Sequence, residues 1–224
     1  MSRDMNLTLF QLPGFPLLQS RRLRLRAPDA GDADAVFALF SAPEVMRYWR
    51  APAMTRRDQA VARIDEILAQ FERRDMINWV IATRAEDRVV GTLSLHGFDA
   101  RRRRVDIGYS LHPGYWRQGL ATEATTLALD WTCRTLDVER IQADIDPGNA
   151  RSRQLLLRQG FSSEGLRDRA IVDNGEGEAE IFGLSATDWR QRASRWARLA
   201  SASSTSATGD QVTGTRQPAS PPRR

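Results

Sequence analysis

A loop with a glycine at its start and another near its middle, residues 114–124, joins an expected strand to an expected helix. It reads Gly-Tyr-Trp-Arg-Gln-Gly-Leu-Ala-Thr-Glu-Ala. Residues 105–111 before it are rich in strand-forming residues, and apolar residues recur at helical spacing after it, from Leu120 to Trp131. A helix that begins at such a loop presents unpaired backbone N–H groups and the positive end of its dipole. The loop therefore predicts a site for a phosphate or pyrophosphate of an anionic cofactor.

The chain's 224 residues suit one ordinary domain with a substantial core. No apolar run approaches the roughly 20 residues of a membrane span, and Pro13 and Pro16 interrupt the apolar N-terminal stretch, so no membrane association and no secretory signal are expected. Cys133 is the only cysteine, and with only His96 and His112 besides it no metal site is expected. We expect Cys133 to be a packing residue and the location to be cytoplasmic.

Every one of the 33 basic residues is an arginine, and the net charge is +5. The absence of lysine excludes a mechanism that passes through a Schiff base. The basic balance favours an anionic ligand.

The N-terminal third predicts one strand and two helices. Residues 22–26 alternate between arginine and leucine, which indicates a strand with both leucines on one face. Pro28 and Asp29 open a helix that Pro43 ends, and a second helix follows Thr55, whose hydroxyl is a natural cap. The buried stripe of the second helix is predicted to be Val61, Ile64, Ile67, Leu68 and Phe71.

The remainder predicts alternating strands and helices. Strands are expected at 79–82, 89–95, 105–111, 140–145, 165–172 and 178–184, and helices at 120–136 and 149–159. Asp173-Asn174-Gly175 is a strong hairpin signal between the last two strands. The order β-α-α-β-β-β-α-β-α-β-β indicates a single α/β domain with a mixed sheet.

The domain boundaries follow from composition. We expect an N-terminal extension at 1–19, a folded domain at 20–190, and a helical extension followed by a tail at 191–224. From about Leu199 the chain is rich in Ser, Thr, Ala, Gly, Pro and Arg, so the tail is expected to be disordered.

A second motif follows the expected strand at 140–145. Residues 146–152 read Asp-Pro-Gly-Asn-Ala-Arg-Ser and open a helix, with Asn149 as the natural N-cap and Ser152 one turn further on. Both side chains should lie near the carboxyl end of the preceding strand, where ligands gather in open sheets. Asn149 could cap the helix, contact a ligand, or do both.

The glycine loop differs from two common nucleotide-binding motifs. It lacks the Gly-Lys-Ser/Thr ending of a P-loop. It also follows the fourth expected strand and does not open the first βαβ unit, which argues against a dinucleotide fold.

Taken together, the motifs resemble those of the GNAT N-acetyltransferases, and within them the branch that includes the ribosomal-protein alanine acetyltransferases. The resemblance spans roughly residues 20–189. It is carried by segments 22–26, 44–49, 107–109, 115–124, 149–152 and 160–161. It implies a GNAT-like domain whose twisted sheet is mixed and mostly antiparallel, with acetyl-CoA as donor and an amine as acceptor.

The resemblance also implies roles on the donor side. The loop amides from Trp116 onward would hold the CoA pyrophosphate, residues 107–111 would run beside the pantetheine arm, and Asn149 would contact that arm. The residues expected to bind the cofactor are Ile107, Tyr109, Trp116, Arg117, Gln118, Gly119, Leu120, Ala121, Thr122 and Asn149.

The chain departs from the family pattern at three positions. Trp116 stands where the broad family often has Gln or Arg, and Arg117 stands where the branch usually has Gly. Many members carry a tyrosine where this chain has Leu156. That tyrosine protonates the departing thiolate, so Ser152 is the candidate acid here, acting directly or through water.

Two carboxylates are candidate bases. Asp106 could relay a proton through water, or it could be a strand-surface residue paired with Arg103 or Arg104. Glu123 is the other candidate, or it could simply favour the first helical turn.

The acceptor is expected to be a protein N-terminus, such as that of a ribosomal protein, or a small amine such as an antibiotic or a polyamine. Residues 46–52 and the hairpin at 173–175 are the expected acceptor-side segments. The alternative is a non-catalytic module that binds CoA or RNA, motivated by Arg101-Arg102-Arg103-Arg104 together with the arginine-ended C-terminal tail. The simpler interpretation is that these arginines belong to a solvated hairpin turn and that the terminus is floppy. The chain is expected to be a monomer or a homodimer.

Overall fold

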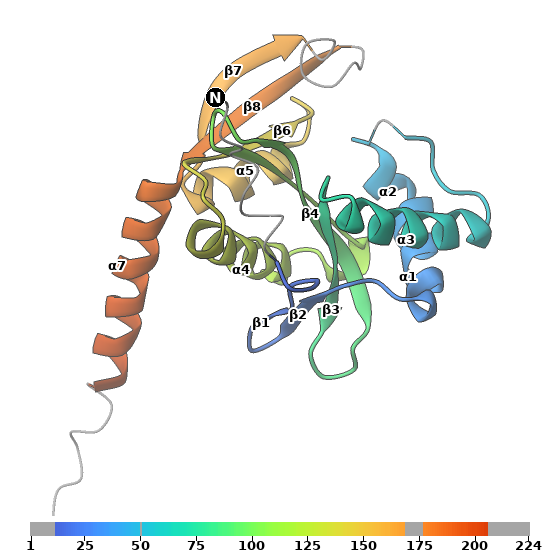
Figure 1. Cartoon of the computed structure of the whole chain (residues 1–224), viewed down its shortest axis with the longest axis horizontal. Helices are drawn as coiled ribbons and strands as arrows, with labels where there is room; N and C mark the ends of the chain where they lie inside the picture. Colours follow the sequence, from blue (N-terminus) through green and yellow to red (C-terminus); the bar gives the residue numbers. More distant parts are fainter. Residues whose placement is uncertain (1–11, 50, 169–176, 206–224) are drawn as a thin grey trace, which may run out of the picture. The chain divides into compact units, whose positions relative to one another are not determined.

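The computed structural model describes residues 12–49, 51–168 and 177–205, without the side chains of residues 196–205. The chain falls into two units, Met1–Arg190 and Gln191–Arg224. The described part of the second unit is the continuation of helix α7 (Ala186–Thr205) (Figure 1). The sheet and the candidate site belong to the first unit. In the described residues, no helix is both long and apolar enough to cross a membrane.

The first unit is built on one eight-stranded sheet in the order β1-β2-β3-β4-β5-β6-β8-β7. The strands are β1 (Leu18–Gln19), β2 (Leu23–Arg26), β3 (Ile77–Thr83), β4 (Val89–Asp99), β5 (Arg104–Leu111), β6 (Arg140–Ile145), β7 (Ser162–Asp168) and β8 (Glu178–Ser185). All neighbours are antiparallel except β5 and β6, which are parallel. The mixed, mostly antiparallel sheet of a single α/β domain is therefore confirmed.

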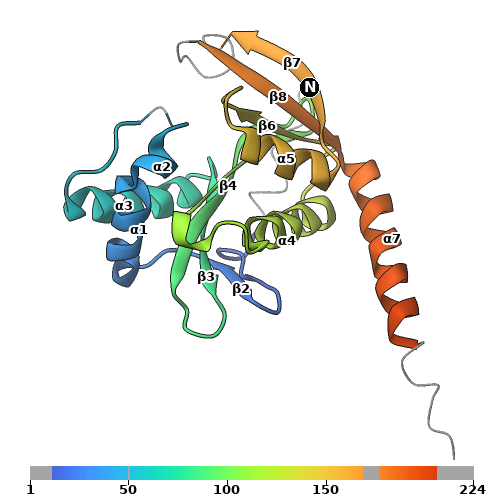
Figure 2. The same cartoon turned by 180° about the vertical axis from the view of Figure 1, so that it is seen from behind.

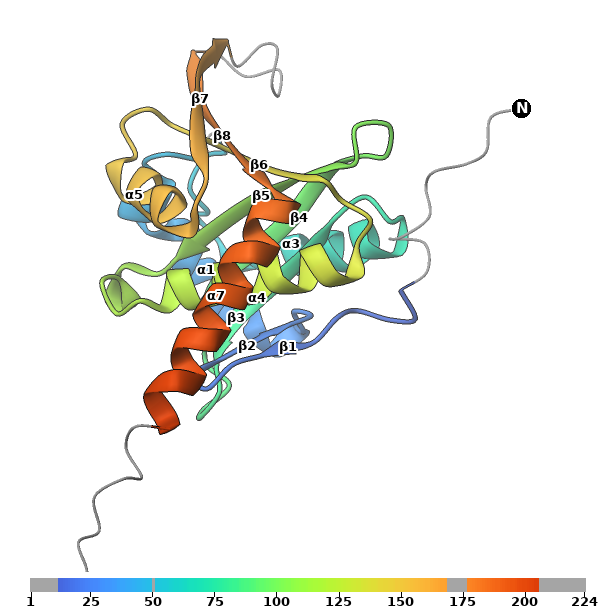
Figure 3. The ribbon, with the colours of Figure 1, turned by 90° about the vertical axis from the view of Figure 1, so that its left-hand side faces the viewer.

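Helices cover both faces of this sheet. They are α1 (Ala33–Ser41), α2 (Pro43–Met46), α3 (Arg57–Glu72), α4 (Leu120–Thr135) and α5 (Ala150–Gln159), with the 3-10 helices η2 (Ala30–Asp32) and η3 (Pro113–Tyr115). The α1–α3 group and α4 lie on opposite sides of β3 and β4 (Figures 1 and 2). Figure 3 looks onto the α4 side.

The alternation of side chains along β3 explains this layering. Val80 and Ala82 point to one face, where they pack with buried residues of α1 and α3. Trp79 points to the other face, where its ring meets Trp131 of α4 edge-on at 5.6 Å between centroids. Leu23 and Leu25 of β2 are also fully buried, as the arginine–leucine alternation predicts.

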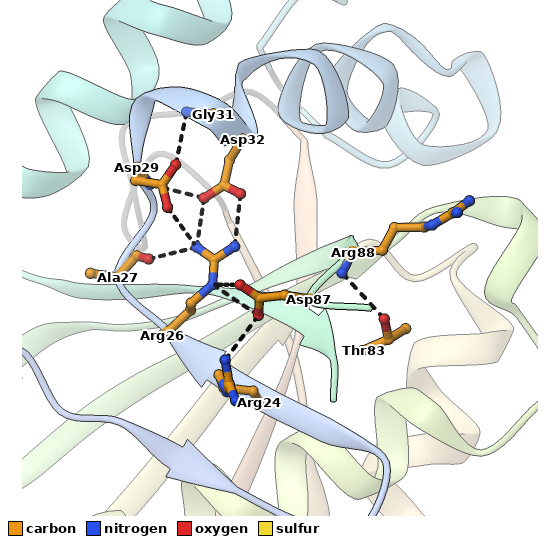
Figure 4. Close-up of polar contacts among 9 residues, drawn as sticks. All are labelled: Arg24, Arg26, Ala27, Asp29, Gly31, Asp32, Thr83, Asp87 and Arg88. Carbon is orange, nitrogen blue, oxygen red and sulfur yellow. Dashed lines mark hydrogen bonds and ion pairs between the residues drawn. The ribbon is translucent and has the colours of Figure 1, made fainter. Parts of the chain in front are cut away.

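Arg26 fixes the start of the α1 layer to the sheet (Figure 4). Its guanidinium donates to both carboxylate oxygens of Asp32, at 2.7 and 2.8 Å, and to Asp87 in the β3–β4 turn at 3.1 Å. Asp29 and Asp32 in turn cap η2. Because the Arg26 and Asp32 side chains are only 15% and 8% exposed, this bidentate pair is shielded from solvent.

The first predicted helix does end just before Pro43, since α1 stops at Ser41, and Pro43 then begins α2, where a missing N–H does no harm. Two other local predictions in this region were wrong. Thr55 does not cap α3, because Gln59 Oε1 accepts from the backbone N–H groups of Thr55 and Arg56. Leu68 is 37% exposed, while Ala60 takes a buried place on the helix.

The C-terminal predictions were partly correct. β8 lies where a strand is expected, and β7 begins three residues before its predicted start at Gly165. The Asp173-Asn174-Gly175 turn lies outside the described residues. Helix α7 runs to Thr205, past Leu199, where the composition begins to change, and residues 206–224 lie outside the described residues.

Candidate active site

A split between neighbouring strands opens the sheet. β5 and β6 pair over three positions, which end at Asp106 with Gln142. Beyond that point β5 stays paired with β4 as far as Leu111, and β6 stays paired with β8 as far as Ile145. The two strands therefore diverge, and the β5 backbone groups that face β6 are left for another hydrogen-bonding partner.

A cavity of about 810 Å³ lies at this split. Its walls come from α2, α3, strands β3 to β6, the loop after β5, and the first turns of α4 and α5. The predicted site residues that line it are Ile107, Tyr109, Trp116, Arg117, Gly119, Leu120, Ala121, Thr122, Asn149 and Ser152. The cavity lining does not include Asp106, Gln118 or Glu123.

The glycine loop enters α4 through two residues in the left-handed backbone region. Arg117 has φ 60° and Gly119, the N-cap, has φ 74°. A glycine adopts this region freely, whereas Arg117 adopts it at a cost in backbone strain. The N–H groups of Gly119, Leu120 and the next two residues have no acceptor within the helix. They form one end of the cavity.

Glu123 braces this loop from behind. Its carboxylate accepts from Ser20 Oγ at 2.6 Å and from Arg22 Nε at 2.6 Å, and Arg22 also donates to the carbonyl of Gln118 at 3.0 Å. Burial raises the pKa of Glu123, but these hydrogen bonds outweigh burial and lower it. Gln118 donates to the carbonyl of Gly114 at 3.1 Å. Both side chains thus hold the loop in place.

Trp116 ties the loop to the rest of the site. Its indole N–H donates to the carbonyl of Leu111 at 2.6 Å, and its ring packs against the α1–α3 core. The guanidinium of Arg151, on α5, lies 4.2 Å from the ring centroid, in a cation–π contact. One side chain therefore links the loop, the end of β5 and the start of α5.

The first turn of α5 brings a second polar group to the cavity. Asn149 caps the helix, its Oδ1 accepting from Ser152 N–H at 3.1 Å. The hydroxyl of Ser152 is 2.8 Å from the hydroxyl of Tyr109 on β5. Burial raises the pKa of Tyr109, so its phenol stays protonated. Leu156, where many family members carry a tyrosine, is buried. The phenol near this helix is that of Tyr109, on β5.

Asp106 sits beside the cavity against Arg104. Its Oδ1 lies 3.4 Å from Arg104 Nε, yet neither atom has a hydrogen-bond partner among the described residues. Burial raises the pKa of Asp106 to about 6, against the opposing effect of Arg104. Gly97 packs against this carboxylate, since a Cβ there would stand 2.6 Å from Asp106 Oδ2, and its φ of 58° favours glycine. The pairing with Arg104 is one of the two readings that the sequence left open.

His96 is a cavity-lining residue that the sequence did not single out. It lies on β4, two residues after Ser94 on the same face, and its Nδ1 is 3.4 Å from Ser94 Oγ. A Cβ on Gly108 would lie 3.5 Å from His96 Cε1, so the ring lies against β5 where the split begins. Burial lowers the pKa of His96, and Asp144 across the split opposes that shift. The imidazole is therefore neutral near neutral pH.

The other predicted features are structural. Cys133 is buried, and burial raises the pKa of its thiol to about 11. In the four-arginine run, Arg102 pairs with Asp99, Arg103 with Asp137 and Glu139, and Arg104 with Asp106. Across the described ranges, no cluster of three or more His, Cys, Asp or Glu could hold a metal ion.

The chain matches known proteins along most of its length. Residues 22–162 match the family model described as Acetyltransferase (GNAT) domain. An uncharacterized N-acetyltransferase of Bacillus subtilis, YoaA, is 35% identical over 161 residues, which are 72% of this chain and 91% of the relative.

Two further matches concern enzymes of ribosomal proteins. The [Ribosomal protein uS5]-alanine N-acetyltransferase of Escherichia coli is 36% identical over 84 residues, only 37% of this chain and 43% of that enzyme. The solved structure of RimL, a ribosomal L7/L12 alpha-N-protein acetyltransferase in complex with coenzyme A, has a TM-score of 0.67 at 18% identity. The match covers 76% of this chain and 98% of the RimL chain. At this identity it shows a shared fold.

Proposed function

The chain belongs to the GNAT acetyltransferase family and is an N-acetyltransferase, and on that premise we propose that it transfers an acetyl group from acetyl-CoA directly to a primary amine. The observation that carries the proposal is the cavity at the β5–β6 split, which has helix N-termini at one end and titratable side chains on opposite walls. We call residues 107–122 and 149–152 the donor wall. We call Arg63, Asn78, Ser94 and His96 the acceptor wall.

The donor wall fits acetyl-CoA in its chemistry. The amides of Gly119 to Thr122 and the side chain of Arg117 offer donors and positive charge to a pyrophosphate. The β5 edge, including Ile107 and Tyr109, offers backbone groups to the amide-rich pantetheine arm, and Asn149 lines the same stretch. When bound, acetyl-CoA supplies the activated acetyl group.

Ser152 and Tyr109 are suited to protonate the departing thiolate. In this proposal the Ser152 hydroxyl gives its proton to the sulfur while the phenol 2.8 Å away stabilises the serine oxygen by a hydrogen bond. Water in the cavity then returns a proton to Ser152, and the proton taken from the amine passes to solvent, so the proton count balances. The pair would thereby replace the tyrosine that many family members carry where this chain has Leu156.

His96 is the base that this geometry favours. The acceptor amine must lose a proton as it attacks, and a neutral imidazole on the acceptor wall, beside Gly108, can take it. Asp106 and Glu123, the carboxylates expected from the sequence, do not line the cavity and are held by arginines. We assign them supporting roles.

The acceptor proposed at the finer level is a protein N-terminus, such as that of a ribosomal protein. Its support is the partial likeness to the uS5-alanine acetyltransferase. A small amine such as an antibiotic or a polyamine is the alternative. RNA binding has less support at the four-arginine run, because three of the arginines at 101–104 already have carboxylate partners. The arginine-ended tail lies outside the described residues.

Calorimetry and turnover test this proposal together. We expect acetyl-CoA to bind in isothermal titration, and coenzyme A to be released when a panel of amines and ribosomal N-terminal peptides is added. Ser152→Ala should lower turnover while acetyl-CoA still binds. A protein that is folded but binds no acetyl-CoA would contradict the proposal.

A further inference from the structure

The acceptor wall contains a buried amide oxygen without a partner. Asn78 lies on β3, is 5% exposed and lines the cavity. Its Oδ1 is enclosed and, among the described residues, this acceptor atom has no hydrogen-bond partner. Buried polar groups in proteins are nearly always paired, so an unpaired one in a cavity wall indicates a ligand that completes it.

A guanidinium without a carboxylate accompanies it. Arg63, on α3, is half-buried and lines the same cavity. Within the described part of the chain it forms no ion pair and no hydrogen bond. Its nearby carboxylate is Glu66, which Arg73 already engages at 2.9 Å. Burial lowers the pKa of Arg63, the direction expected when a cation loses water without gaining an anion.

The strand register places Asn78 close to the proposed base. Asn78 is directly opposite Ser94 in the β3–β4 ladder, and His96 follows two residues later on the same face. Diagonal neighbours of this kind are about 7–8 Å apart. An amine held at His96 is therefore within reach of Asn78 Oδ1, in the cavity that Arg63 also lines.

We propose that Arg63 forms a carboxylate-binding subsite, that Asn78 Oδ1 accepts a hydrogen bond from the acceptor's amine, and that the acceptor is a primary amine that carries a carboxylate a few bonds away. This inference rests on the proposed acetyl transfer and makes the acceptor more specific. The Arg63 guanidinium donates to carboxylate oxygens, the unpaired Asn78 Oδ1 takes an N–H of the amine, and a second cation beside Arg63 would be repelled. A free amino acid or an acidic side chain beside a peptide N-terminus supplies this chemistry, whereas a polyamine does not.

A matched set of amines tests the subsite. Three five-carbon acceptors differ only in the distal group: 5-aminopentanoate, pentylamine and 1,5-diaminopentane. Two amidated peptides, Ala-Asp-Ala-Ala and Ala-Asn-Ala-Ala, form a second arm that separates the two sources of the carboxylate. We expect kcat/KM to favour the carboxylate over its neutral partner by about tenfold or more in at least one arm.

Substitutions then locate the preference. Arg63→Gln should reduce the ratio of carboxylate to neutral acceptor to about one. Arg63→Lys should retain part of it, because the charge remains. Arg57→Gln is the matched control: Arg57 is exposed on the same helix, pairs with Asp34 and does not line the cavity, so the ratio should not change.

The outcomes separate this inference from the proposed function. If acetyl-CoA binds and the neutral or cationic amines are acetylated as well as the carboxylates, the subsite is overturned while acetyl transfer stands. A preference that survives Arg63→Gln in a protein with unchanged melting temperature overturns it too. If no acetyl-CoA binds, the proposed function fails and the subsite with it.

Discussion

The donor wall and the acceptor wall face one cavity but are built in different ways. The donor wall consists mainly of backbone: an unpaired strand edge and the N–H groups that begin two helices. Most of its side chains stand within short contiguous motifs, at 107–122 and 149–152. The acceptor wall consists of side chains from α3, β3 and β4, which are far apart in sequence.

This difference explains why one half is recognisable and the other is not. A backbone site needs particular dihedral angles and helix starts, which glycines and capping residues fix locally. A side-chain site needs several elements to be packed at set distances, and each of its residues looks ordinary alone. The following four experiments test how far the contrast holds.

The largest effect is expected at the acceptor wall, from His96→Gln. Loss of the base should lower kcat by about 10²–10⁴-fold, and acetyl-CoA affinity should change little. In the unaltered enzyme the rate should fall as the pH drops below about 6.5, because the imidazole must be neutral and burial lowers its pKa from that value. Steady-state rates from pH 5 to 9 measure both.

Retention of that acidic limb in His96→Gln would assign the proton to another group. The charged groups that face the ring are Asp144 and, across the ladder, Asp106. Asp106→Asn is the matched variant to test next, since its pKa of about 6 falls in the same range.

The next effect concerns how the α1 layer is held to the sheet. Arg26→Gln leaves the buried Asp32 carboxylate without its bidentate partner, and we expect the free energy of unfolding to fall by about 3 kcal/mol. Arg24→Gln, which breaks a more exposed contact with Asp87 at 3.4 Å, should cost less than about 1 kcal/mol. Urea unfolding of the two variants compares them, and equal losses would contradict the role given to Arg26.

The donor wall should respond to charge at the start of α4. Ala121→Asp suits the helix dipole and should not unfold the protein, but its carboxylate would face the pyrophosphate. We expect the dissociation constant for acetyl-CoA to rise on the order of a hundredfold. Ala121→Asn, of the same size and without charge, should have a much smaller effect. Calorimetry measures the dissociation constant of each variant. Similar constants for Ala121→Asp and Ala121→Asn would show that the pyrophosphate does not bind at the start of α4.

The smallest effect is expected between Tyr109 and Ser152. Tyr109→Phe should lower kcat by about tenfold. In the double variant with Ser152→Ala, the loss of kcat should be smaller than the product of the two single losses. Additive losses would mean that the two hydroxyls act separately. Acetyl-CoA affinity serves as the control, since neither change removes a phosphate contact.

Local signals predicted much of the fold correctly. The leucines of β2, the Asn149 cap and the start of α4 at Leu120 were expected from a few neighbouring residues each. The errors came where two local choices compete. At the start of α3 the side chain of Gln59, and not that of Thr55, forms the capping hydrogen bonds. The face of α3 that packs against the core includes Ala60 and leaves Leu68 exposed.

The sequence by itself indicated the family, the order of most strands and helices along the chain, and the residues proposed for the donor wall, because these depend on dihedral preferences and short-range hydrogen bonds. Only the tertiary structure decided that β5 and β6 part after Asp106, and that His96 faces the resulting cavity while Glu123 braces its loop. The physical reason is that strand alternation places a side chain on a face, but the packing of distant helices decides whether that face is covered or left open to a substrate.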